Sequence, residues 1–214
     1  MTLVDRIREA IFSGDLAPNQ RLIEADLCAQ FDASRSHIRN ALADLVSEGL
    51  LERVPNRGAR VRAITVAEAV EFTEVRMVVE GLCAAKAAVR ITDAEAEQLS
   101  AIGERMKRQV ASGDLIAYSD SNKELHSFIR RISGQTAAGA IIERLRGNLV
   151  RHQIRLALRP GRAAASLPQH LEIIGAICDR DRDRAEMAMR EHLRSVIEAL
   201  EATTQASVPN GALR

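Results

Sequence analysis

Apolar residues recur at helical spacing from the start of the chain. Val4, Ile7 and Ile11 lie three and four positions apart within residues 3–13, so one face of this segment can be buried while the other stays polar. Glycine readily adopts the left-handed conformation that commonly ends a helix, and Gly14 stands at that position. The pattern therefore predicts an amphipathic helix that ends at Gly14.

Two further helices are predicted at short intervals. Residues 24–31 form a short second helix, and either Ser34 or Ser36 can cap a third, because a serine hydroxyl accepts a hydrogen bond from the first helical turn. The apolar face of the third helix consists of Ile38, Ala41, Leu42, Leu45 and Val46. Gly49 is expected to end it.

A β-hairpin is predicted directly after the third helix. Residues 50–54 and 59–62 have the pattern of short strands, and the Pro-Asn-Arg-Gly sequence at 55–58 between them is typical of a turn. Three helices followed by such a hairpin form a winged helix-turn-helix.

Helical patterns fill the chain beyond residue 64. Thr65–Glu68 and Thr92–Glu95 are capping boxes, in which the two end side chains satisfy backbone N–H groups of the first turn. Later helices are predicted over residues 114–133, 136–158, 166–179 and 183–202. We therefore expect about six helices in an all-α C-terminal bundle.

These patterns predict a mainly α protein. It comprises a winged helix-turn-helix domain at residues 1–63, an all-helical domain at 64–203, and a flexible tail at 204–214. Composition agrees, because aromatic residues make up only 2% and tryptophan is absent, whereas helix-favouring Ala, Leu, Arg and Glu are abundant. RNA-binding modules that stack bases on exposed aromatic rings are excluded on the same ground.

Charge is distributed unevenly within the predicted N-terminal domain. The whole chain has a formal net charge of +1, so any attraction to nucleic acid must be local. Residues 5–34 contain three arginines and six acidic residues, whereas residues 35–62 contain six arginines and three acidic residues. The third helix and the hairpin therefore form the basic half of the domain.

Cysteine usage and hydropathy favour a cytoplasmic protein. Cys28, Cys83 and Cys178 lie far apart with no CxxC pair, which indicates neither a disulfide framework nor a cysteine zinc site. No apolar run approaches the ~18 residues that span a bilayer, and the first residues lack a signal-peptide pattern. We expect a chain that works in a reducing cytoplasm and has no membrane partner.

The third helix carries side chains suited to reading DNA. A recognition helix enters the major groove with its N-terminal turn first, so short polar and arginine side chains are needed there. Arg35 and Arg39 lie four positions apart, and either can donate two hydrogen bonds to a guanine edge. The alternative is that these arginines only solvate an exposed helix face. The candidate DNA contacts are Ser34, Arg35, Ser36, His37, Arg39, Asn56, Arg57 and Gly58, the last three in the hairpin turn.

A family resemblance supports the DNA-binding interpretation. The stretch IREAIFSGDLAPNQRLIEADLCAQFDASRSHIRNALADLVSEGLLERVPNRGARV resembles the winged helix-turn-helix of the GntR family of bacterial transcription regulators. The resemblance implies binding to double-stranded operator DNA. Asn19 stands where the family often has Gly, and His37 and Asn40 replace the usual Pro and Glu of the recognition helix. These departures affect which operator sequence is expected, and they leave the expectation of DNA binding itself unchanged.

Polar residues in the C-terminal half are spaced so that they can converge. Asn122 precedes His126 by four positions, so both lie on one helix face. His170 and His192 are 22 positions apart on two successive predicted helices, which an antiparallel hairpin would bring together. Taken singly, each histidine fits a packed or surface residue. Taken together, they fit a metal site, or a polar cavity in which the histidines hydrogen-bond to one another or to an organic acid.

The same residues carry a second resemblance. The downstream region resembles the FCD effector domain of the FadR subfamily, in which an Asp or Asn four residues before a His, and two later His residues 22 apart, surround a buried metal ion. The resemblance extends the match to about residues 3–200 and implies a site formed by Asn122, His126, His170 and His192. Three neutral imidazoles with open positions suit zinc first, with nickel or manganese as alternatives.

An open metal position also suits a carboxylate, so a small organic acid is the expected effector. Arg76 stands where the first effector-domain helix of the family often carries an arginine that faces the cavity. The alternative role of Arg76 is an ion pair with Glu80, four positions later. Tyr118, His152 and Arg155 are the other candidate effector-binding residues.

These expectations combine into a ligand-responsive transcription regulator, with repression as the commoner outcome in the family. A homodimer is expected because one short helix contacts only a few base pairs, and two-fold symmetry doubles the contacts on a palindromic operator. Two alternatives stay open, a metal-dependent hydrolase that uses the histidine cluster and a direct sensor of the metal ion. The chain lacks an HExxH motif and a suitably spaced catalytic acid or base, so no enzymatic activity is expected.

Overall fold

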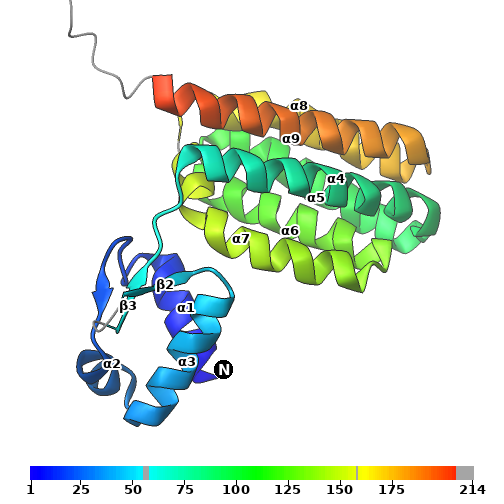
Figure 1. The fold of residues 1–214 in the computed structure, drawn as a ribbon. Coiled ribbons are helices and arrows are strands. Elements are labelled where there is room, and N and C mark those ends of the chain that lie inside the picture. Colours follow the sequence, from blue (N-terminus) through cyan, green and yellow to red (C-terminus); the bar gives the residue numbers. More distant parts are fainter. Residues whose placement is uncertain (55–57, 158, 206–214) are drawn as a thin grey trace, which may run out of the picture. The chain divides into compact units, whose positions relative to one another are not determined.

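The computed structural model describes residues 1–54, 58–157 and 159–205, without the side chains of 146–148, 150, 151, 153–155, 204 and 205. The chain forms two compact units, of which the first is built mainly from Met1–Thr65 and the second begins at Val66. The first unit contains three helices and a small sheet, and the second is a bundle of long helices (Figure 1).

The first unit has the winged helix-turn-helix arrangement that the sequence predicts. Its helices are α1 (Leu3–Ser13), α2 (Glu24–Phe31) and α3 (Arg35–Ser47), and its strands are β1 (Arg21–Leu22), β2 (Leu51–Val54) and β3 (Gly58–Val61). The strands form an antiparallel sheet in the order β1-β3-β2. The β1 strand was not expected, because two residues are too short to show an alternating pattern; Arg21 pairs with Arg60 and Leu22 with Ala59.

The core of the first unit lies between α1, α3 and the sheet. The predicted apolar face of α3 is buried at Ile38, Ala41, Leu42 and Leu45, and Val46 packs against the same core while half-buried. Burying one face of α3 holds its opposite face in a fixed orientation toward solvent, which positions the polar side chains considered below.

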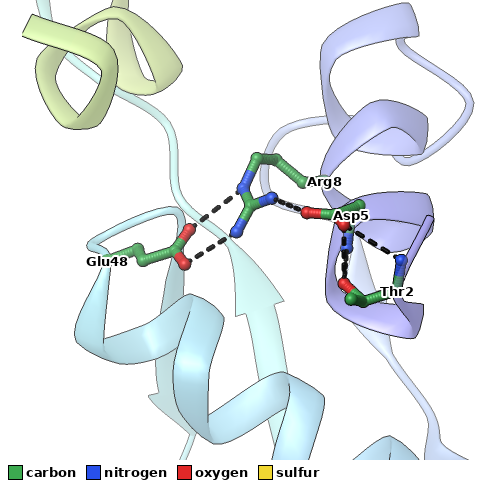
Figure 2. A network of polar contacts seen from close by, with 4 residues as sticks. All are labelled: Thr2, Asp5, Arg8 and Glu48. Atoms are coloured by element: carbon green, nitrogen blue, oxygen red, sulfur yellow. Dashed lines mark hydrogen bonds and ion pairs between the residues drawn. The ribbon is translucent and has the colours of Figure 1, made fainter. Parts of the chain in front are cut away.

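A polar network fixes the start of α1 to the end of α3 (Figure 2). Thr2 caps α1 by accepting from the Asp5 N–H at 3.1 Å, and the Asp5 carboxylate accepts from the backbone N–H and the hydroxyl of Thr2. These hydrogen bonds lower the pKa of Asp5 to about 2. Arg8 then donates two hydrogen bonds to Glu48, at 3.1 and 2.7 Å, so a planar guanidinium and carboxylate pair joins the two helices.

The second unit contains α4 (Val66–Arg90), α5 (Asp93–Ser112), α6 (Leu115–Ser133), α7 (Thr136–Ala157), α8 (Arg162–Cys178) and α9 (Arg182–Gln205). The capping box at Thr92 is present as predicted. Figure 1 shows α4 and α9 running side by side, and their buried apolar side chains share one core with those of α5, α6 and α8. Among the helices described, none is long and apolar enough to cross a membrane.

Two predicted boundaries in this unit differ from the structure. The α8 helix begins at Arg162 instead of residue 166, and Pro168 lies inside it. Proline is commonest in a first helical turn; here Pro168 removes one interior hydrogen bond of a helix already begun. The α9 helix continues to Gln205, into the predicted tail, and residues 206–214 lie outside the described part of the chain.

Candidate DNA interface and histidine cluster

The N-terminal half of α3 presents its polar side chains to solvent. Arg35, Ser36, His37 and Arg39 are exposed, whereas Ile38 between them is completely buried. This alternation follows from the helical repeat, because Ile38 belongs to the buried row with Ala41, Leu42 and Leu45, whereas its chain neighbours His37 and Arg39 point to either side of that row. The predicted contact residues of α3 therefore lie where a DNA groove can reach them.

Local contacts already hold the side chains of three predicted DNA-contact residues. The Ser34 hydroxyl caps α3 by accepting from the His37 N–H at 3.3 Å, and it lies 3.0 Å from the Ser36 hydroxyl. The Arg39 guanidinium donates to both oxygens of Glu24 on α2, at 3.1 and 2.9 Å. The Arg35 side chain forms no ion pair in the part of the chain that the structure describes, so it is the more available of the two arginines.

The predicted turn of the hairpin is described only at its last residue. Asn56 and Arg57 lie outside the described residues. Gly58 begins β3 with a φ of +86°, and a Cβ at this position would come within 3.0 Å of the Leu22 carbonyl oxygen. A glycine is therefore required for the close approach of β3 to β1, which gives Gly58 a structural role; its contact with DNA stays a prediction.

The three predicted histidines of the second unit converge in its interior. His126 comes from α6, His170 from α8 and His192 from α9, and all three are buried. The ring centroids of His170 and His192 lie 4.3 Å apart, and those of His126 and His192 lie 5.4 Å apart. One nitrogen from each ring falls within 4.8 Å of the others, a spacing that a single metal ion can bridge. We call these residues the histidine cluster.

In each ring of the histidine cluster, Nδ1 forms a hydrogen bond with an oxygen atom of another residue. The partner of His126 is Glu80 Oε2 at 2.5 Å. The partner of His170 is the Tyr118 hydroxyl at 2.9 Å, and that of His192 is Oε1 of the Gln169 amide at 3.1 Å. With oxygen partners at all three Nδ1 atoms, Nε2 is the atom that each ring can offer to an ion, which is how metal-binding histidines are commonly oriented.

The protonation that these partners require suits a metal ion. The carboxylate of Glu80 and the amide oxygen of Gln169 can only accept, so Nδ1 of His126 and His192 must carry hydrogen, and in a neutral ring Nε2 is then a bare lone pair. Nε2 of His192 lies 3.2 Å from Nε2 of His170. Burial lowers the pKa of His170 and of His192 well below the usual value, so both rings are neutral, the form that binds metals.

Asn122 supplies a fourth candidate ligand. It lies on α6 one helical turn before His126. Its side-chain oxygen is buried and has no hydrogen-bond partner in the described part of the chain. Buried polar atoms are rarely left without a partner, so this oxygen indicates that another group binds there. The donor set of one amide oxygen and three imidazoles therefore fits a divalent ion.

An ion pair supports the cluster from α4. Arg76 and Glu80 are both buried, and Nη2 of Arg76 lies 2.8 Å from Glu80 Oε1. Burial raises the pKa of Glu80, but the positive charge of Arg76 and the hydrogen bond with His126 outweigh it, so the pKa falls well below its usual range. The i,i+4 ion pair, weighed as one alternative from the sequence, is present, and binding of an effector by Arg76 stays a prediction.

The remaining predicted effector residues fall in different surroundings. Tyr118 is buried and belongs to the cluster through His170. Burial raises the pKa of its phenol far above the usual value, so Tyr118 keeps its proton. His152 is half-buried on α7. Arg155 is a residue of α7 whose side chain lies outside the described residues.

Sequence reasoning missed three residues of this region. Glu80 was weighed only as a partner of Arg76, and Gln169 not at all, although it directly precedes His170. The third is Arg162, whose Nη1 donates to the carbonyl and the hydroxyl of Ser195 at 3.2 and 3.0 Å, one turn after His192. Nη2 of Arg162 is buried and has no acceptor among the described residues. No spacing rule links these residues to the histidines, because each contact crosses between helices.

Comparison with protein families assigns both units. The model of "Bacterial regulatory proteins, gntR family" matches residues 1–61, and the model of the FCD domain matches residues 71–195. The second match covers more than half of the chain, and together they span the two compact units.

Individual proteins resemble the chain over nearly its full length. The HTH-type transcriptional repressor RspR of Escherichia coli K12 is 27% identical over 190 residues, which are 89% of this chain and 83% of that protein. The HTH-type transcriptional repressor NanR of Cronobacter sakazakii is 27% identical over 224 residues, covering 92% and 82%. The solved structure of E. coli McbR/YncC is 20% identical, covers 94% of this chain and 96% of its own, and has a TM-score of 0.77, which shows a common fold.

Proposed function

The chain belongs to the FCD-domain proteins of the gntR family of bacterial regulatory proteins and is a transcriptional regulator, and from this premise we propose how it works. It binds a two-fold operator in double-stranded DNA as a homodimer. A small organic acid, held beside a divalent metal ion in the histidine cluster, changes its operator affinity. Repression is the proposed outcome, as in the names of relatives such as RspR and NanR.

The observation that carries DNA binding is the solvent-facing polar half of α3. Arg35 is exposed at the first position of this helix, and the buried face behind it fixes the direction in which it points. A guanidinium in that place can donate two hydrogen bonds to a guanine, while Ser36 and His37 beside it can reach phosphates or base edges. The hairpin turn would add contacts through Asn56, Arg57 and Gly58.

Effector binding is assigned to the histidine cluster. His126, His170, His192 and Asn122 would hold the ion, with zinc proposed first and nickel or manganese next. The bound ion would supply positive charge for a carboxylate of the effector. The buried Nη2 of Arg162, which has no acceptor in the described chain, can donate to a second oxygen of the same ligand. Arg76, Tyr118, His152 and Arg155 stay proposed contacts of the effector.

Selection from a random pool of double-stranded DNA tests the operator proposal. The purified protein, at one stated salt concentration, is expected to enrich a short palindrome, since each protomer places one α3 helix on one half-site. The selected DNA is then titrated with and without a panel of organic acids. A pool that shows no enrichment under any of these conditions contradicts the proposal.

Metal analysis tests the effector half independently. The purified protein is expected to retain about one divalent ion per chain, and His192→Ala is expected to lose it, because the cluster supplies most of the ligands. His37→Ala is the matched control, since His37 lies exposed on α3 and outside the cluster. Equal metal content in the two variants would contradict the assignment.

A further inference from the structure

Asn40 on α3 is an exposed polar residue to which the proposed function assigns no role. It lies two positions after Ile38, whose side chain is completely buried in the core of the first unit. Because an α-helix turns by about 100° per residue, Asn40 stands about 200° round the helix from Ile38. The side chain of Asn40 therefore starts almost opposite the core and leads away from it into solvent.

Ser36 and Asn40 form the outermost line of α3. Ser36 lies two positions before Ile38, as Asn40 lies two positions after it, and residues four apart stand one above the other on a helix. The Ser36 hydroxyl lies 3.0 Å from the Ser34 hydroxyl, so it already has a partner. The Asn40 amide has no hydrogen-bond partner in the part of the chain that the structure describes. Its donor and its acceptor are therefore both available to a ligand.

The charges along α3 indicate how far contact with DNA extends on this line. Arg35 and Arg39 precede Asn40, and their guanidinium groups attract phosphates. Asp44 stands one turn after Asn40, is exposed and forms no ion pair among the described residues; its carboxylate repels phosphates. On the proposed function, DNA therefore meets the first half of α3, and Asn40 is the last uncharged polar residue in that half.

The chemistry of a side-chain amide selects one base. Its nitrogen donates and its oxygen accepts, side by side in one plane. In the major groove, adenine alone presents an acceptor next to a donor, N7 and the N6 amino group, whereas guanine presents two acceptors. Cytosine offers a donor, and thymine offers an acceptor beside a methyl group, so each of them satisfies only half of the amide.

We propose that Asn40 reads one adenine in each half-site of the operator, donating to N7 of the base and accepting from its N6 amino group. The inference rests on the proposed function, because it requires α3 to lie in a major groove. Phosphate binding is the alternative role of a polar residue on a recognition helix. The position of Asn40 favours the base, because the outermost line of the helix reaches the floor of the groove while the flanking faces pass the two backbones.

Parallel selections from one random pool of double-stranded DNA test the assignment on the full-length protein. The original protein is expected to select adenine at one position of each half-site, and Asn40→Ala to lose the preference at that position alone. Asn40→Glu is expected to replace this adenine with cytosine, because a carboxylate accepts from the N4 amino group of cytosine.

The matched control is Gln98→Ala, which removes an exposed side-chain amide from α5 of the second unit. It should leave the selected sequence unchanged. Asn40 is exposed and asparagine is a poor helix former, so α3 should tolerate both Asn40 variants. Circular dichroism of each variant would verify that the fold is kept.

Replacing one atom of the selected adenine tests the hydrogen bonds themselves. Deaza-adenine, in which a C–H group replaces N7, still pairs with thymine but cannot accept from the Asn40 amide. The original protein is expected to bind the modified operator about tenfold more weakly than the natural one, whereas Asn40→Ala should bind the two equally. Fluorescence anisotropy at one salt concentration measures all four affinities.

The outcomes separate this inference from the proposed function. If the original protein selects a palindrome but Asn40→Ala weakens binding to every sequence equally, or to none, Asn40 does not read a base; the inference is then wrong and the operator proposal stands. The inference is equally wrong if Asn40→Glu keeps the original preference at every position. If the original protein selects no sequence at all, the operator proposal itself fails and the inference falls with it.

Discussion

At Asn122 one side-chain atom decides how tightly the histidine cluster can hold a metal ion. An amide oxygen brings no charge to the ion, whereas a carboxylate at the same position would attract it by several kcal/mol even in a partly screened environment (about ε 20). Asn122→Asp is therefore expected to tighten metal binding by at least about tenfold. Competition with a chelator of known affinity measures the change.

The same substitution has an opposite effect on the metal-free protein. The carboxylate introduced by Asn122→Asp would be a buried charge without a partner, so the apo form should unfold at a lower temperature than the original apo protein. Asp120→Asn is a suitable control, because Asp120 is exposed and pairs with Lys123 on the surface of α6. Unchanged metal affinity in Asn122→Asp would remove this residue from the ligand set.

Arg162 provides a prediction about the effector. Its buried Nη2 lacks an acceptor in the described chain, and the acidic oxygens of an organic acid are the acceptors that a guanidinium binds best. Arg162→Gln is expected to weaken binding of the most effective acid in the screening panel about tenfold or more, measured by calorimetry at unchanged metal content. Arg159→Gln controls for charge, because Arg159 donates to the Ala199 carbonyl at 3.0 Å and is not part of the proposed site; equal losses in the two variants would contradict a direct contact.

The sequence predicted the convergence of the three histidines better than it predicted the residues that hydrogen-bond to them. His126, His170 and His192 could be proposed because a family spacing links them, and the structure brings them together. Glu80 and Gln169 escaped prediction because each meets its histidine across two helices, at a contact that no periodicity along one helix encodes. Long-range polar contacts of this kind depend on how the helices pack.

Among the elements, α3 carries the sharpest prediction about DNA. Arg35 is exposed and forms no ion pair in the described chain, whereas Arg39 must first separate from Glu24 before it can contact DNA. The Arg39–Glu24 ion pair is exposed, so water and salt screen it and it adds little stability. Arg35→Ala is expected to weaken binding to the selected operator by ~1–3 kcal/mol. Arg182→Ala removes the same charge from an exposed position of α9 and should have little effect. Fluorescence anisotropy with labelled operator distinguishes the two.

Glu24 on α2 allows the role of Arg39 to be separated from that of Arg35. Glu24→Gln removes the carboxylate that holds Arg39 and takes a negative charge away from the proposed DNA face, so operator affinity should rise by a few-fold. Arg39→Ala should reverse that gain in the double variant. If Glu24→Gln has no effect with or without Arg39, then Arg39 does not contact DNA.

Element boundaries followed from sequence wherever a local signal marks them. Gly14 and Thr92 stand at the helix ends where they were expected, because capping depends on a few neighbouring residues. The β1 strand and the start of α8 were not predicted. Leu22 becomes a strand residue only because β3 lies beside it, and the helix around Pro168 is held by packing that overrides the local preference of proline.

At the scale of the whole molecule, the histidine cluster joins α6 to the pair α8 and α9, from which α7 separates it in sequence, so a bound metal ion should stabilise the second unit as one body. An ion that binds only the folded chain adds about 2.7 kcal/mol when its free concentration is a hundred times its dissociation constant. Chelation is therefore expected to lower the unfolding temperature by about 5–10 °C, measured by circular dichroism.

The His126→Ala variant provides the decisive comparison. It removes a ligand of the proposed site, so its unfolding temperature should be lower than that of the metal-loaded protein and should respond little to chelator. His37→Ala keeps the cluster intact and should lose stability on chelation as the original protein does.

The helices α1, α2 and α3 contribute no residue to the histidine cluster. Amide hydrogen exchange in the first unit, measured without operator DNA, should therefore be the same before and after metal removal. A chelator that destabilised His126→Ala as much as the original protein would mean that the ion which matters for stability is bound somewhere other than the histidine cluster.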